Sequence, residues 1–300
     1  MLNFRSGLTK LIKFRFGMHM PILSNFSTAA SIVSLCVFRA KLQNHNMQVV
    51  ILAGGLGTRL SELTSTIPKP MVMIGDQPIL YHIMKYYASF GHKDFVIALG
   101  YKGFEIKDYF INVNNRNSDL ELDFTTGTTK IIAGETLDWK ITFVDTGLET
   151  QTGGRLLKLN AHLENEFLLT YGDGLSDVDI NKVIESHRAS DYLATVTAVI
   201  PPARFGSLKI IGNKVTAFSE KNPKDESRIN GGFFCVSKRI LDFIGGTEIA
   251  FEREPLMELA KHGLLGAYRH DGFWHSMDTL RDQQSLNTIW QSGDVPWVKP

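Results

Sequence analysis

Residues 51–71 read ILAGGLGTRLSELTSTIPKPM, a glycine-rich loop that follows a short apolar run. The run itself, MQVVILA from Met47, has the character of a buried strand in a parallel sheet. A strand that leads into AGGLGTR places several backbone N–H groups at the carboxyl edge of a sheet, where ligands of doubly wound sheets bind. Bare amides suit phosphate groups, so this stretch predicts a phosphate-binding loop.

The spacing of the glycines excludes the two commonest loops of this kind. Gly55, Gly57 and Leu60 do not form the G-x-G-x-x-G fingerprint of dinucleotide-binding folds. No Gly-Lys-Ser/Thr follows, as a Walker A loop requires. A glycine-rich turn without a ligand stays open as the alternative at this point.

Two cations close to the loop favour the phosphate interpretation. Arg59 is tethered to the loop, so its guanidinium can clamp phosphate oxygens in a fixed geometry. Lys69 lies between Pro68 and Pro70, on a stiff backbone. A lysine that meets a phosphate at a fixed distance gains from this stiffness, because binding then costs less entropy.

Strands and helices alternate along the rest of the chain. This order predicts an α/β, Rossmann-like fold with a mainly parallel mixed sheet, helices on both faces and a β-rich C-terminal elaboration. LELDF, within residues 112–138, is expected to be an edge strand. The expected strands cover 47–53, 95–99, 139–145, 166–174 and 192–200, with shorter ones around 207–220 and 230–237. The expected helices cover 78–90, 103–111, 153–163, about 180–188, 252–262 and 279–292.

Residues 1–46 differ from the remainder in composition. They hold six of the 32 basic residues and no acid, which leaves 26 basic against 31 acidic residues in the body. Two interpretations remain open: a targeting leader, or sequence upstream of a true start at Met47. The second is favoured because Met47 directly precedes the first strand. We therefore expect an N-terminal extension over 1–46, disordered or outside the enzyme, and one continuous domain over 47–300.

Bulk composition narrows the class of protein. A net charge of +1 gives no reason to expect a nucleic-acid partner. The least polar part of the N-terminal segment, residues 21–38, contains many serines and makes a poor membrane span. Cys36 and Cys235 offer neither a disulfide framework nor metal-ligand spacing, which suits a reducing, cytoplasmic setting.

The motif G-G-x-G-T-R-L followed by P-K-P resembles the signature of the sugar-phosphate nucleotidylyltransferases. Five more motifs resemble the glucose-1-phosphate cytidylyltransferases within that family. They are TGGRLLKL (152–159), TYGDG (170–174), PPARFGSL (201–208), INGGFF (229–234) and FWHSMDTLRD (273–282). The thymidylyl relatives typically have Gly-Asp-Asn and a Gln-bearing loop at these places, so CTP is expected rather than dTTP. The resemblance runs from Met47 to about Trp297.

The resemblance implies that the chain transfers the cytidylyl group of CTP to α-D-glucose 1-phosphate with Mg²⁺. It assigns phosphate or catalytic contacts to Arg59, Lys69 and Arg155. It assigns the nucleotide site to Leu52, Ala53, Gly54, Gly55, Gly57, Thr58, Arg59, Thr152, Gly153, Arg155 and Asp173. It assigns the sugar phosphate to Lys69, Gly206, Glu220, Lys221 and Asn230, and the metal to Asp173 and Asp278. It also implies a homo-oligomer, a trimer or a hexamer.

Three places depart from the family pattern, and the last two weaken the assignments near the sugar phosphate and the metal. Ser61-Glu62-Leu63-Thr64 replaces the usual x-P-L-T, away from the phosphate contacts. Glu220-Lys221-Asn222-Pro223 is one residue longer than the usual Glu-Lys-Pro, and His275-Ser276 replaces a usual Gln-Pro. The alternatives are the same chemistry with dTTP, UTP or another sugar 1-phosphate, and, more remotely, a sugar-nucleotide-binding regulator without catalysis.

Overall fold

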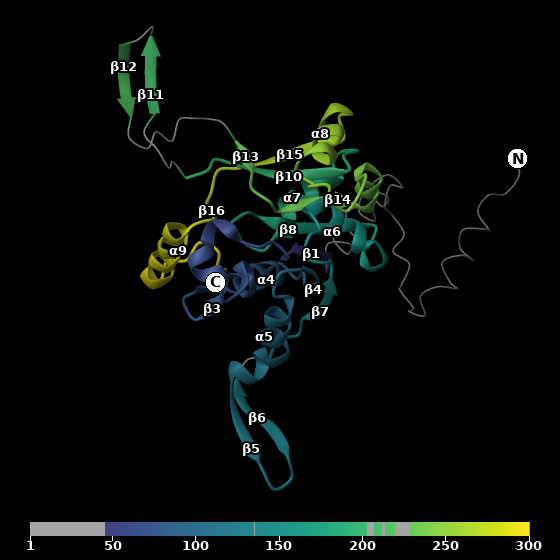
Figure 1. Cartoon of the computed structure of the whole chain (residues 1–300), viewed down its shortest axis with the longest axis vertical. Helices are drawn as coiled ribbons and strands as arrows, with labels where there is room; N and C mark the ends of the chain where they lie inside the picture. The colour runs from purple at the N-terminus through teal and green to yellow at the C-terminus, as the bar shows by residue number, and fades with distance from the viewer. Residues whose placement is uncertain (1–45, 135, 203–206, 212–213, 220–227, 300) are drawn as a thin grey trace, which may run out of the picture. The chain divides into compact units, whose positions relative to one another are not determined.

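An eight-stranded mixed sheet forms the centre of the computed structural model, which describes residues 46–134, 136–202, 207–211, 214–219 and 228–299 (Figure 1). The strand order is β13-β10-β14-β8-β1-β4-β7, and β15 pairs with β10. The strands are β1 (Gln48–Leu52), β4 (Asp94–Leu99), β7 (Lys140–Asp145), β8 (Glu166–Tyr171), β10 (Ala194–Val199), β13 (Ile229–Asn230), β14 (Phe234–Ser237) and β15 (Leu265–His270).

Parallel pairing dominates the half of the sheet that contains the glycine-rich loop. Strand β1 pairs in parallel with both β4 and β8, and β4 pairs in parallel with β7. Strand β14 runs antiparallel to β8 and β10, while β10 and β15 are parallel. The predicted mainly parallel, mixed sheet is therefore confirmed, and the later strands extend this same sheet.

Both faces of the sheet are covered. All five residues of β1 are buried, and alternate residues enter opposite cores, with Val49 and Ile51 in one and Val50 and Leu52 in the other. The first core also receives α4 (Ile79–Ser89), α5 (Gly103–Arg116), α7 (Ile180–Arg188) and α9 (Leu280–Ser292). The second receives α6 (Thr152–Lys158) and α8 (Glu254–Lys261). Helices on both faces were predicted, and they are confirmed.

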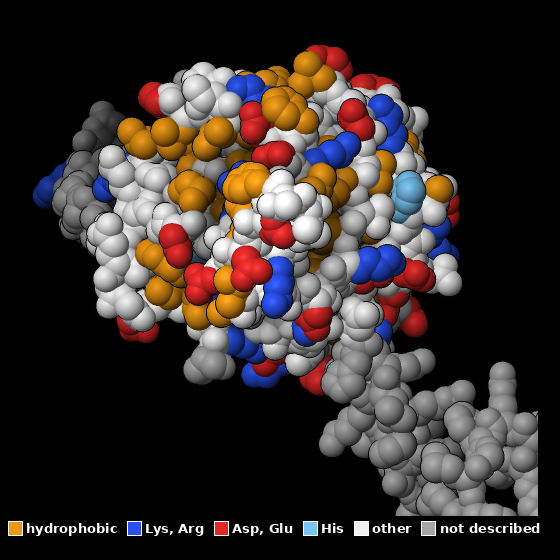
Figure 2. Space-filling model, turned by 90° about the horizontal axis from the view of Figure 1, so that it is seen from below, with side chains coloured by type: hydrophobic (Ala, Val, Ile, Leu, Met, Phe, Trp, Pro, Cys, Tyr) orange, Lys and Arg blue, Asp and Glu red, His pale blue; other side chains and the backbone are white. Residues whose placement is uncertain are grey.

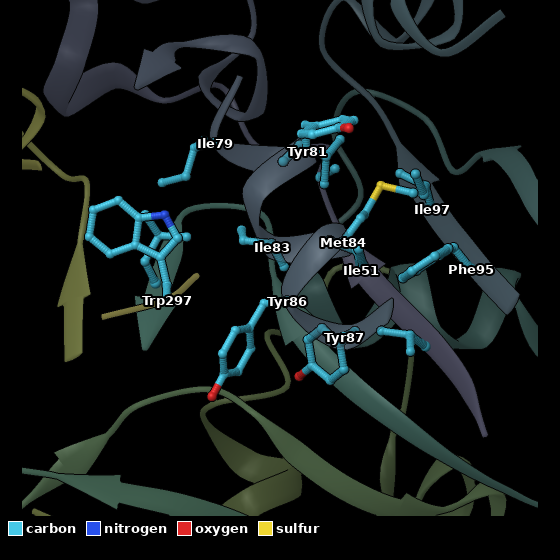
Figure 3. Packing of buried hydrophobic residues seen from close by; sticks show 14 of the residues in the cluster. Ile51, Ile79, Tyr81, Ile83, Met84, Tyr86, Tyr87, Phe95, Ile97 and Trp297 are labelled. Atoms are coloured by element: carbon cyan, nitrogen blue, oxygen red, sulfur yellow. The ribbon is translucent and has the colours of Figure 1, made fainter. Parts of the chain in front are cut away.

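Helix α4 shows how the first core is built. Figure 3 shows its side chains against Ile51 of β1 and Phe95 and Ile97 of β4. The ring of Tyr87 stacks on Phe233 with 5.9 Å between centroids. The apolar face expected from the sequence is buried as a whole: Ile79, Leu80, Ile83, Met84 and Tyr87.

The strand expected at LELDF is confirmed, and it lies at the edge of a small hairpin instead of the central sheet. Strand β5 (Ser118–Asp123) pairs with β6 (Thr128–Gly134) in a two-stranded hairpin, separate from the central sheet. The side chain of Asp123 accepts hydrogen bonds from the backbone of Thr125 and Thr126, which stabilises the turn locally. Every residue of β6 is exposed, because neither strand offers a continuous apolar face to a larger sheet.

The remaining elements are short. Those near the loop are η1 (Thr58–Leu60), α3 (Ser61–Thr64), η2 (Lys69–Met71), β2 (Met73–Ile74) and β3 (Gln77–Pro78). Later ones are η3 (Asn160–His162), β9 (Gly174–Ser176), β11 (Ser207–Ile211), β12 (Lys214–Ser219), η4 (Lys238–Phe243) and β16 (Trp274–Ser276). Among the described residues, no helix is both long and apolar enough to cross a membrane.

Candidate active site

The glycine-rich loop leaves β1 at the carboxyl edge of the sheet and turns sharply at Gly57. Its φ of +64° lies in the left-handed region that favours glycine. The backbone N–H of Leu60 and the hydroxyl of Thr64 both donate to the Gly57 carbonyl, each at 2.9 Å. These bonds fix the turn between the strand and the short helices that carry Arg59.

The side chain of Arg155 holds the loop from inside the protein. Its guanidinium donates to the carbonyls of Gly54 (2.9 Å), Leu99 (3.0 Å) and Gly147 (2.9 Å), and to the hydroxyl of Thr146 at 2.5 Å. The residue is only 4% exposed. A direct contact with phosphate stays a prediction; in this structure Arg155 anchors the loop.

Lys69 lies between the two predicted metal ligands. Its ammonium is 2.6 Å from Asp173 Oδ2 and 2.9 Å from Asp278 Oδ1. The guanidinium of Arg59, an exposed side chain, lies 3.4 Å from the same oxygen of Asp278. The structure thus brings together four predicted residues from three distant parts of the chain.

A short pair of strands explains how the two aspartates meet. Strands β9 and β16 are antiparallel, with Ser276 opposite Gly174. The N–H of Met277 then donates to the carbonyl of Asp173 at 2.9 Å. This bond places Asp278 beside Asp173 although 105 residues separate them.

Close packing brings Lys69 to this position. Pro70 lies against Gly172, where an added Cβ would approach the proline ring to 3.2 Å. The N–H of Gly172 donates to the carbonyl of Leu52 at 3.1 Å, at the end of β1. A side chain at position 172 would therefore crowd the ring of Pro70, next to Lys69.

The three charged groups stabilise one another. Burial alone would lower the pKa of Lys69, but the attraction of Asp173 and Asp278 outweighs it, so this pKa lies above its usual value. Burial alone would raise the pKa of Asp278, yet Lys69 and then Arg59 hold it below its usual value. Lys69 and Asp278 therefore both stay charged around neutral pH.

Two cavities adjoin at this cluster, and both are lined by Arg59, Tyr171, Asp173 and Asp278. The smaller, about 280 Å³, also includes Lys69. Its other predicted lining residues are Leu52, Ala53, Gly54, Gly55, Gly57, Thr58, Thr152 and Arg155. The larger, about 770 Å³, includes the predicted Asn230 and also Trp274 and Glu252.

Among the predicted residues that the structure describes, Gly153 alone lines neither cavity. Gly153 is buried in α6 and packs against the carbonyl of Ile249, which an added Cβ would approach to 2.7 Å. Gly206, Glu220 and Lys221 lie outside the described residues.

One other group of metal-ligating side chains exists among the described residues: Glu166, His187 and Cys235. Arg188 already pairs with Glu166 at 2.6 Å. Burial raises the pKa of the Cys235 thiol far above its usual value, so the sulfur stays protonated. The acidic pair at Lys69 is therefore the better candidate for a metal.

Comparison with known proteins decides the family. Residues 48–261 match the family model described as nucleotidyl transferase. The chain belongs to this family. Nucleotidyl transferases of this kind generally use a divalent metal, and the carboxylates of Asp173 and Asp278 are the hard oxygen ligands such an ion prefers.

Curated relatives extend the match to most of the chain. The glucose-1-phosphate cytidylyltransferase of Salmonella typhimurium is 47% identical over 253 residues, which are 84% of this chain and 98% of the relative. The probable glucose-1-phosphate cytidylyltransferase of Bacillus subtilis is 44% identical and covers 84% and 99%. The crystal structure of HddC from Yersinia pseudotuberculosis is similar with a TM-score of 0.61 and 28% identity, over 81% of this chain and 99% of that one.

Sequence reasoning missed three residues of this nucleotidyl transferase site. Tyr171 and Glu252 line the larger cavity and hydrogen-bond to each other. No local sequence pattern predicts this contact, because the two residues are 81 positions apart. Asp282, which also lines the larger cavity, is 8% exposed and completes a capping box with Thr279. The spacing of these two at the start of α9 was the available signal.

The fit between Gly54 and Arg155 can be tested by unfolding. A Cβ at Gly54 would lie 2.2 Å from Arg155 Nη1, whereas a Cβ at Gly55 would meet no atom within 4 Å. We expect Gly54→Ala to lower the free energy of unfolding by about 1–3 kcal/mol, because the buried guanidinium cannot move away freely. Gly55→Ala is the matched control, with a change of about 1 kcal/mol or less. Equal urea midpoints for the two variants would contradict this role of Arg155.

Proposed function

We propose that this nucleotidyl transferase transfers the cytidylyl group of CTP to α-D-glucose 1-phosphate, giving CDP-glucose and pyrophosphate. The observation that carries the proposal is the cluster of Lys69, Asp173 and Asp278 at the junction of two cavities. The identity of 47% with a relative named glucose-1-phosphate cytidylyltransferase supports the choice of substrates.

The proposed chemistry needs cations rather than a general base. A phosphate oxygen of glucose 1-phosphate forms a bond to the α-phosphorus of CTP while the bond to pyrophosphate breaks. This nucleophile is already ionised near neutrality, because the second pKa of a phosphate monoester is about 6. The barrier is electrostatic, since two polyanions meet and negative charge grows on the leaving group.

The residues of the smaller cavity answer this need. The loop amides, from Leu52 to Thr58, and Arg59 bind the triphosphate, and Lys69 stabilises the reacting phosphates. Thr152 borders the nucleotide, Arg155 acts through the loop carbonyl it holds, and Gly153 lets α6 pack closely against Ile249 behind them. Asn230, with Gly206, Glu220 and Lys221, is assigned to the sugar phosphate.

Mg²⁺ fits the pair of carboxylates. Asp173 and Asp278 converge on the ammonium of Lys69, so their oxygens already surround a position where a cation is stable. When bound, Mg²⁺ neutralises phosphate charge at the reaction centre. Asp173 and Asp278 would hold the ion, and Lys69 beside them would stabilise the reacting phosphates.

A substrate panel tests the proposed function. We expect the full chain to release pyrophosphate from CTP only when both glucose 1-phosphate and Mg²⁺ are present. UTP, dTTP and other sugar 1-phosphates are the comparison substrates. Equal turnover with dTTP or UTP would refute the assignment of CTP as the nucleotide. If no combination of substrates releases pyrophosphate, a sugar-nucleotide-binding regulator is favoured.

Substitutions at the charged cluster separate metal binding from phosphate stabilisation. We expect Asp278→Asn to weaken Mn²⁺ binding in electron paramagnetic resonance titrations with CTP, and to lower the rate by roughly 10² or more. Lys69→Ala should lower the rate by a similar factor without weakening Mn²⁺ binding, since it removes a competing cation. Asp191→Asn, at an exposed position, is the matched control. Unchanged Mn²⁺ affinity in Asp278→Asn would refute the metal assignment.

We also propose a homo-oligomer, a trimer or a hexamer, that works in the cytoplasm. Large apolar side chains are exposed on α5 and the β5–β6 hairpin, among them Phe104, Ile111, Leu122 and Phe124. Figure 2 shows hydrophobic side chains exposed between charges of both signs on one face. Sedimentation equilibrium should give a mass of three or six chains, and a monomer at micromolar concentration would contradict this.

Cell fractionation tests the proposed location, and the protein is expected in the cytoplasmic fraction.

A further inference from the structure

Glu252 sits in the wall of the larger cavity on a rigid support. It precedes α8 and follows Phe251, which is fully buried and lies 5.9 Å from the ring of Phe234. The N–H of Phe251 donates to the hydroxyl of Thr152 at 2.8 Å. The exposed carboxylate of Glu252 is therefore attached to a segment fixed by the second core.

Two hydrogen bonds orient this carboxylate. Thr152 donates to Oε2 at 2.6 Å, and the phenol of Tyr171 donates to Oε1 at 2.7 Å. An ionised carboxylate accepts about four hydrogen bonds, which leaves about two positions for donors from a ligand.

The chemistry of the site selects the ligand group. A carboxylate is negatively charged, so it repels phosphates, and because it only accepts hydrogen bonds it binds donors such as hydroxyl groups. The neighbouring amide of Asn230 donates to the Tyr171 hydroxyl at 3.2 Å, and the Trp274 indole lines the same cavity. An oriented carboxylate, an amide and an aromatic surface together suit a hexose with its several hydroxyl groups.

We propose that Glu252 is a specificity-determining residue that accepts hydrogen bonds from hydroxyl groups of the sugar. This inference rests on the proposed function, because it names the part of that substrate which the larger cavity binds. The nucleotide lies on the other side, since Thr152 lines the smaller cavity and Glu252 lines only the larger. Glu252 thus holds the sugar while its partner Thr152 borders the nucleotide.

Kinetics and product binding of Glu252→Gln test the proposal. The KM for glucose 1-phosphate should rise roughly 10-fold or more, as for a lost hydrogen bond to a charged group, while the KM for CTP stays within about twofold. In calorimetric titrations, affinity for CDP-glucose should fall by a similar factor and affinity for CDP should not change. Glu254→Gln, at an exposed position two residues further on, should behave as the wild type in both measurements.

Deoxy analogues of glucose 1-phosphate identify the hydroxyl. For the analogue that lacks the bonded hydroxyl, wild type and Glu252→Gln should have the same kcat/KM, while the other analogues keep the difference.

If Glu252→Gln changes only the preference for CTP over UTP, the proposal is overturned and Glu252 lies at the base. Equal loss of CDP and CDP-glucose affinity would show a merely structural role. If the wild type does not use glucose 1-phosphate at all, that result refutes the proposed function itself. It is thereby distinguished from a failure of the proposal on Glu252, which concerns only the variant.

Discussion

The contact of one lysine with two carboxylates is the interaction on which the site depends. Asp173 and Asp278 both lie within hydrogen-bond distance of the Lys69 ammonium. Two carboxylates this close repel each other, so a cation between them stabilises the pair. A different backbone constraint positions each group. The β9–β16 register places Asp173, the capping box of α9 places Asp278, and the packing of Pro70 on Gly172 places Lys69.

The phosphate loop obeys a complementary constraint. When its amides face a ligand, its carbonyls point inward and need hydrogen-bond donors. Arg155 supplies such a donor to the carbonyl of Gly54. The guanidinium is buried among carbonyl and hydroxyl acceptors, so its positive charge is solvated without a carboxylate in hydrogen-bond contact. A cation held in this way behind the loop favours an anion in front of it.

Much of the architecture was predictable because it is local. The apolar run at β1, the amphipathic face of α4 and the cap at Asp179 all follow from residues close in sequence. Alternation predicted the strand at β5 but not its partner β6, because an alternating pattern marks a strand without identifying the strand it pairs with. The burial of Asp282 was not predicted, because a charge on a surface helix is usually solvated, while here it completes a cap.

The sequence by itself determined the fold class, the phosphate loop and the identity of the charged residues, because periodicity and motif spacing are short-range properties. Only the tertiary structure decided what these residues touch. It turned Arg155 inward to the loop carbonyls, joined Lys69 to both aspartates, and set Glu252 against Thr152 and Tyr171. Such contacts join positions about 80 to 210 residues apart, and strand order and register, which no local pattern encodes, bring them together.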